Sequence, residues 1–110
     1  MFVDIVSFTQ RAEAMTPDET FGFLTGLMET LGPVIQSRNG FVDKYLGDGI
    51  MAVFDRPDHF HEDSVACAVD IITAIENYNA TRKALWRSSN NGNTPTDSPT
   101  ALPVKVGIGI

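Results

Sequence analysis

The sequence predicts an α+β domain in which an antiparallel sheet carries its helices on one face. Short runs rich in Val, Ile and Phe alternate with two long stretches whose apolar residues recur at helical spacing. Two of the short runs are separated only by a Gly-Asp-Gly tripeptide, which is typical of a hairpin. The resulting order of strand, helices, strand, strand, helix, strand favours antiparallel pairing with the helices on one side.

The elements follow in order along the chain. Residues 1–4 form an apolar run that ends in a carboxylate, a pattern that predicts the C-terminal end of a buried strand. Residues 6–15 predict a short helical stretch. Thr16, Pro17 and Glu19 then predict a helix start with a capping box. This helix should run to the stop signal Asn39-Gly40 with a kink at Pro33, and should bury one stripe: Phe21, Leu24, Leu27, Met28, Leu31, Val34 and Ile35.

Residues 41–46 and 50–54 predict the two strands of the hairpin. A second long helix follows at about residues 62–83, and we expect its inner face to consist of Val65, Ala68, Val69, Ile72 and Ile75. Residues 87–103 are rich in Ser, Asn, Thr and Pro and predict a flexible polar loop. A last strand is expected at 104–110, so the whole order is βαββαβ, a ferredoxin-like arrangement.

Composition narrows the functional class. With 110 residues, 43% of them hydrophobic, the chain can form one small domain. Its net charge of -6 excludes a nucleic-acid surface, because no cluster of Lys and Arg could neutralise phosphates. An acidic protein that handles a polyphosphate needs positive charge from elsewhere, usually a divalent cation held by carboxylates.

Cysteine content and hydropathy point to a chain without disulfides or membrane contact. Cys67 is the single cysteine, and its place in an apolar helical stretch predicts a small buried hydrophobic side chain. No apolar run reaches membrane-spanning length, and the N-terminal residues lack the pattern of a signal peptide. We therefore expect this segment to be cytoplasmic and free of membrane contact, within a parent protein that could be anchored elsewhere.

Two carboxylates occupy positions where chemistry is possible. Asp4 closes a strand directly before a helix start, and Asp48 lies between the glycines of the predicted hairpin. Taken singly, Asp4 is better explained as a helix cap and Asp48 as a turn residue. In a βαββ arrangement the strand end and the hairpin tip can converge. Two carboxylates beside a helix N-terminus would then hold a pair of magnesium ions and promote phosphoryl transfer.

Two segments resemble the metal motifs of class III adenylyl and guanylyl cyclases. The first is residues 2–9, FVDIVSFT, and the second is residues 43–54, DKYLGDGIMAVF. The similarity continues through residues 61–63 and the helix after them to the last strand, so it covers nearly the whole chain apart from the polar loop. The resemblance identifies residues 1–110 as part of a cyclase catalytic domain.

The resemblance implies the metal ligands. Asp4 and Asp48 would bind two Mg²⁺ ions, with Mn²⁺ as a possible substitute, and the Ile5 carbonyl would be a further ligand.

It also implies the nucleotide contacts. The backbone amides of Val6, Ser7 and Phe8 would lie near the β and γ phosphates, although Ser7 stands where many relatives have Gly. Lys44 falls at the family's base-reading position, where lysine accompanies adenine and glutamate accompanies guanine. Its presence favours ATP as the substrate.

The implied activity is magnesium-dependent conversion of ATP to cyclic AMP and pyrophosphate for intracellular signalling. The partners would be ATP and a second cyclase domain, in a homodimer or with another chain, each completing the other's site. The family's second base-reading residue and its transition-state asparagine and arginine lie downstream of the strand 104–110. We therefore expect residues 1–110 alone to show no appreciable cyclase activity. A guanylate cyclase and a non-catalytic dimerisation or nucleotide-binding module are the alternatives. A diguanylate cyclase ranks behind them, because residues 47–50 lack that family's Glu-Phe continuation.

Overall fold

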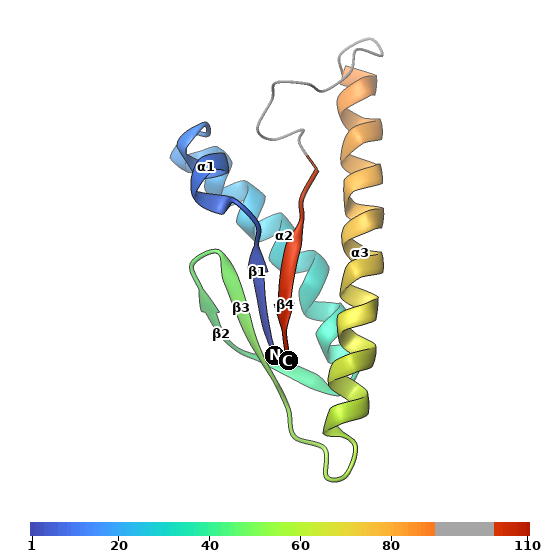
Figure 1. Cartoon of the computed structure of the whole chain (residues 1–110). Helices are drawn as coiled ribbons and strands as arrows, with labels where there is room; N and C mark the ends of the chain where they lie inside the picture. The colour runs from blue at the N-terminus through green and yellow to red at the C-terminus, as the bar shows by residue number, and fades with distance from the viewer. Residues whose placement is uncertain (90–102) are drawn as a thin grey trace.

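The computed structural model describes residues 1–89 and 103–110. Its four strands form one antiparallel sheet in the order β2-β3-β1-β4, with β1 in the interior of the sheet (Figure 1). The two long helices pack on one face of this sheet, which confirms the α+β, ferredoxin-like prediction. The elements are β1 (Phe2–Ile5), α1 (Phe8–Glu13), α2 (Pro17–Ser37), β2 (Gly40–Leu46), β3 (Gly49–Phe54), α3 (Phe60–Ser89) and β4 (Val106–Gly109).

Helix α2 begins where the sequence predicts. The Glu19 N–H donates to Thr16 Oγ1 and the Thr16 N–H donates to Glu19 Oε1, both at 3.1 Å, which completes the capping box. The helix continues through Pro33. Asn39, just after the helix end, has a φ of 65°, the left-handed conformation in which helices commonly end.

The predicted stripe of α2 is correct at Leu27, Leu31 and Ile35 and wrong at Phe21. Phe21 is 74% exposed, and Phe23 takes a place in the core instead. Both phenylalanines lie near the edge of the apolar stripe, so helical spacing alone does not decide which of them faces the sheet.

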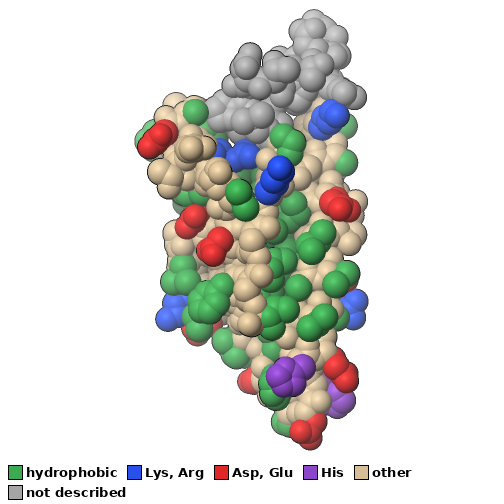
Figure 2. All heavy atoms as spheres, in the orientation of Figure 1, with side chains coloured by type: hydrophobic (Ala, Val, Ile, Leu, Met, Phe, Trp, Pro, Cys, Tyr) green, Lys and Arg blue, Asp and Glu red, His purple; other side chains and the backbone are tan. Residues whose placement is uncertain are grey.

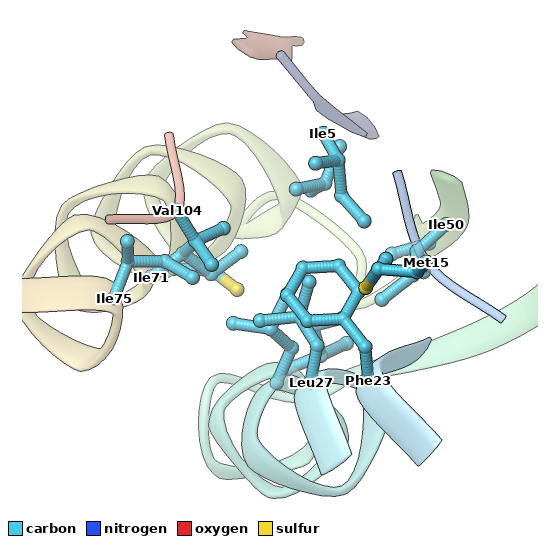
Figure 3. Close-up of a cluster of buried hydrophobic side chains, with 13 residues drawn as sticks. Ile5, Met15, Phe23, Leu27, Ile50, Ile71, Ile75 and Val104 are labelled. Atoms are coloured by element: carbon cyan, nitrogen blue, oxygen red, sulfur yellow. The ribbon is translucent and has the colours of Figure 1, made fainter. Parts of the chain in front are cut away.

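The core lies between the sheet and the two long helices. Figure 3 shows Phe23 and Leu27 of α2 pointing toward Ile50 of the sheet, while Ile71 and Ile75 of α3 pack around Val104. Cys67 is fully buried in the same cluster, as the sequence predicts. Burial raises the pKa of its thiol to about 11.

Helix α3 departs from the prediction in two respects. It extends to Ser89, so residues 87–89 of the predicted polar loop are helical; residues 90–102 of that loop lie outside the described residues. Its inner face is also different: Ile75 is buried as expected, but Val65, Val69 and Ile72 are exposed. In the part of the chain that the structure describes, no helix is both long and apolar enough to cross a membrane.

Polar contacts fix α3 against the rest of the fold near its start and at Asn79 in its second half. Near its start, the buried Asp63 accepts hydrogen bonds from Arg56 Nε at 2.9 Å and Arg56 Nη2 at 2.8 Å, and these bonds lower the pKa of its carboxyl. Farther along, the Asn79 side chain donates to the Val104 carbonyl at 2.9 Å and accepts from the Val104 N–H at 2.8 Å. This second contact positions the chain where it enters β4, which is shorter than the predicted strand.

Candidate metal-binding site

The tip of the β2–β3 hairpin consists of Gly47 and Asp48. Leu46 pairs with Gly49, so these two residues alone form the loop. Gly47 has a φ of 61°, a left-handed conformation that glycine adopts readily and that the first position of a type II′ hairpin turn requires. The sequence predicted Gly47-Asp48-Gly49 as the connection. Asp48 lies in the turn as predicted, whereas Gly49 is already the first residue of β3.

Strand β1 runs directly beside this tip. Asp4 pairs with Gly49, and the Ile5 N–H donates to the Asp48 carbonyl at 3.2 Å. A Cβ atom on Gly49 would lie 2.5 Å from Asp4 Oδ1 and 3.0 Å from the Val3 carbonyl oxygen. The Asp4 carboxylate therefore extends over Gly49 toward the hairpin, in space that only glycine leaves open. The two carboxylate-bearing residues converge as the topology suggested.

The convergent pair has the chemistry of a divalent-cation site. Asp4 is exposed on the uncovered face of the sheet and Asp48 is half-buried, so both have access to solvent. Among the described residues, no group of three or more His, Cys, Asp or Glu side chains could form a closed metal cage. Mg²⁺ keeps several waters and commonly takes one or two carboxylates plus substrate phosphates. An exposed carboxylate on the sheet and a half-buried one in the adjacent turn fit that pattern.

The turn between β1 and α1 is only partly available to an anion. The Val6 N–H donates to the Lys105 carbonyl at 2.8 Å, so this amide is engaged in the sheet and the expectation for Val6 is not supported. Ser7 has φ 57° and ψ 34° and makes no side-chain capping bond, while Phe8 begins α1. A residue with a Cβ is strained in this left-handed region. Glycine has no Cβ and would therefore suit position 7 better than serine does.

Lys44 lies on the same open face as Asp4, one row away. Lys44, Met51 and Phe2 pair across β2, β3 and β1 and form one row. Asp4 pairs with Gly49 and belongs to the next row on the same face. Strand spacing puts the Lys44 and Asp4 Cα atoms about 12 Å apart. A bulge at Asp43 turns Lys44 to this face, and its side chain is 56% exposed, with Asp43 Oδ2 at 3.9 Å.

Two features of the site were not predicted from the sequence. The need for glycine at position 49 depends on the pairing with Asp4, which no local pattern reveals. The uncovered sheet face also carries large apolar side chains: Phe2, Phe41 and Leu46 are 48%, 45% and 44% exposed. The alternation of Phe2 with the buried Val3 was the available signal, because alternate residues of a strand face opposite sides.

Comparisons with known proteins agree on one kind of domain. The family model described as "Adenylate and Guanylate cyclase catalytic domain" matches residues 1–110. An adenylate cyclase of Anabaena cylindrica is 37% identical over 111 residues, which is 100% of this chain and 20% of that protein.

Solved structures show the same fold. The crystal structure of the guanylyl cyclase Cya2 superimposes with a TM-score of 0.76 at 24% identity, covering 96% of this chain and 48% of the other. A bacterial light-regulated adenylyl cyclase gives a TM-score of 0.65 at 23% identity, covering 72% and 40%. The chain thus spans about a fifth of the curated relative and about half of the first solved one.

Proposed function

Because the chain belongs to the adenylate and guanylate cyclase catalytic domain family, we propose that it forms the metal-binding and nucleotide-binding part of a class III adenylate cyclase. The reaction would close the ribose hydroxyl oxygen onto the α-phosphorus of ATP while the bond to pyrophosphate breaks, giving cyclic AMP. The approach of Asp4 to the hairpin tip that carries Asp48 is the observation on which the proposal rests.

In this proposal Asp4 and Asp48 hold Mg²⁺, with Mn²⁺ as a substitute and with the Ile5 carbonyl as a further ligand. When bound, the metal would lower the pKa of the attacking hydroxyl and neutralise triphosphate charge. The protein's own part is to hold the two carboxylates at fixed positions. The hydrogen bond from the Ile5 N–H to the Asp48 carbonyl supports that role, because it joins the two ligand-bearing segments.

The nucleotide would lie along the open face, from the carboxylates toward Lys44. The amides of Ser7 and Phe8 remain candidates for phosphate contacts, whereas that of Val6 is engaged. Lys44 would donate to an adenine ring nitrogen that guanine presents as N–H, which favours ATP over GTP. The exposure of Lys44 and its position on the face that carries Asp4 support this assignment.

The partner would be a second cyclase domain, in a homodimer or from another chain. The open sheet face supports this, because Phe2, Phe41 and Leu46 leave apolar surface beside Asp4 and Lys44. A partner that covers this face would bury the apolar side chains and enclose the nucleotide between the two domains.

A titration with Mn²⁺ and a non-hydrolysable ATP analogue tests the metal site directly. We expect the 110-residue chain to bind the metal–nucleotide complex, and Asp4→Asn and Asp48→Asn each to abolish binding. Asp55→Asn, which removes an exposed carboxylate just after β3, is the matched control and should change nothing. Equal binding by wild type and both site variants would exclude the metal site and leave a non-catalytic module.

A further inference from the structure

Helix α3 carries a second apolar face that nothing in the described chain covers. Val65, Val69 and Ile72 are 54%, 59% and 52% exposed, on the side away from the buried face of the helix. Figure 2 shows hydrophobic side chains gathered over α3 on the visible surface. A helix with apolar residues on opposite faces is normally covered on both. The sequence pattern therefore indicates that this side of α3 meets another element.

The exposed residues follow the spacing of a helix–helix contact. Val65, Val69 and Ile72 are four and three residues apart, and the same alternation reaches Glu62 on one side and Glu76 on the other. This is the a/d pattern of a coiled-coil seam, with β-branched residues at its centre. We call these five residues the outer seam. It offers a short apolar centre with one carboxylate at each end.

Charge decides against a second copy of α3 as the occupant. An antiparallel pair that stacks Val69 on Val69 would bring Glu62 against Glu76, and a parallel pair would bring each glutamate against itself. Like charges at such positions are destabilising, and they select against the pairing. Both glutamates are exposed, and the whole chain carries a net charge of -6. The favoured occupant is positively charged at both ends of its apolar stripe.

We propose that the outer seam docks an amphipathic helix of a partner protein, with apolar residues at heptad spacing and Lys or Arg facing Glu62 and Glu76. The contact does not involve the open sheet face and is independent of the metal site. An anionic membrane surface is disfavoured by the same two glutamates, because it would repel them.

The probe is a fluorescein-labelled helical peptide of about three heptads, with Leu at its central a and d positions and Lys at the a and d positions that flank this apolar centre at each end. Fluorescence anisotropy should detect binding to the full chain, and amide shift changes in a ¹⁵N-labelled chain should map to α3. Val69→Glu should weaken binding roughly tenfold or more. Phe21→Glu places the same charge at an exposed apolar residue of α2 and should leave binding unchanged.

A charge exchange tests the choice of occupant. The double variant Glu62→Lys with Glu76→Lys should prefer a peptide in which Glu replaces the flanking Lys, which reverses the wild-type preference. Equal losses in the Val69 and Phe21 variants would overturn the proposal, since binding would then be non-specific. It would also be overturned by a wild-type dimer that Val69→Glu dissociates, or by binding to anionic vesicles without binding to the peptide.

Discussion

The carboxylate of Asp4 lies over Gly49, so closely that a Cβ atom at position 49 would fall 2.5 Å from Asp4 Oδ1. Gly49→Ala should therefore displace the carboxylate and weaken metal–nucleotide binding. The Val3 carbonyl at 3.0 Å is backbone and cannot yield easily, so the free energy of unfolding should also fall by about 1–3 kcal/mol. Isothermal titration and urea unfolding measure the two effects.

The control for this substitution is Gly22→Ala, where a Cβ atom would meet nothing within 4 Å on an exposed part of α2. It should stabilise the chain by about 0.5–1 kcal/mol through helix propensity and leave binding unchanged. Unchanged metal–nucleotide binding in Gly49→Ala would mean that the position of the Asp4 carboxylate does not matter.

Ser7 should be a strained position. Its φ of 57° places a residue with a Cβ in the left-handed region. Ser7→Gly should raise the free energy of unfolding by up to about 1 kcal/mol, with part of the gain offset by the greater freedom of glycine in the unfolded chain. Ser7→Val should lower it by about 1–2 kcal/mol, because a β-branched side chain tolerates this conformation poorly. Urea unfolding compares the three chains, and a stabilising valine would contradict the assignment.

Lys44 should set the preference for the base. Loss of a charged hydrogen-bond donor typically costs about 1.5–3 kcal/mol, so Lys44→Glu should weaken binding of the ATP analogue roughly tenfold or more and favour the GTP analogue. Competition between the two labelled analogues measures the ratio. Lys83→Glu makes the same charge change on exposed α3 and should leave the ratio unchanged. A ratio that is equal in wild type and Lys44→Glu would remove Lys44 from base recognition.

Acid should destabilise the fold through Asp63. Hydrogen bonds from Arg56 hold the pKa of Asp63 below its ordinary value. The ionised Asp63 carboxylate makes its full contribution to the free energy of unfolding above its pKa in the unfolded chain, at about pH 4. This contribution is lost as the pH falls through the lower pKa of the folded chain. Urea midpoints between about pH 6 and pH 2 should therefore fall less steeply in Asp63→Asn than in wild type. Arg38 also lowers the pKa of Asp70, so part of the pH dependence of the urea midpoint should remain in Asp63→Asn.

Cys67 should be inert in the native chain. Its side chain is fully buried and its thiol pKa is raised to about 11, so very little thiolate forms near neutral pH. Reaction with a disulfide reagent at about pH 8 should be slow in the native chain and fast after unfolding in urea. Rapid native labelling would show that the core opens around this residue.

The sequence predicted those parts of the fold that local chemistry determines. Thr16 and Glu19 mark a helix start by their own hydrogen bonds, and the hairpin follows from glycines at its tip. Most of the inner face of α3, apart from Ile75, was predicted wrongly because Val65 and Ile71 are both apolar, and only the neighbouring sheet decides which is buried. The hydrogen bond of the Val6 N–H was beyond prediction for a related reason. Its partner, the Lys105 carbonyl, lies just before β4, far along the chain, and no local pattern could assign it.

The position of β1 inside the sheet has a kinetic consequence. Its partners are β3 and β4, which lie far along the chain, and even the N-terminal ammonium donates to the Ala52 carbonyl at 3.0 Å. Strand β1 is therefore paired on both edges only after β4, the later of its two neighbours along the chain, has been made. Contacts between distant segments slow folding, so the strand that carries Asp4 should be among the last to become ordered. During synthesis, Asp4 and Asp48 could meet once α2 and the β2–β3 hairpin have emerged, whereas the β4 edge of β1 would stay open until α3 has also been made.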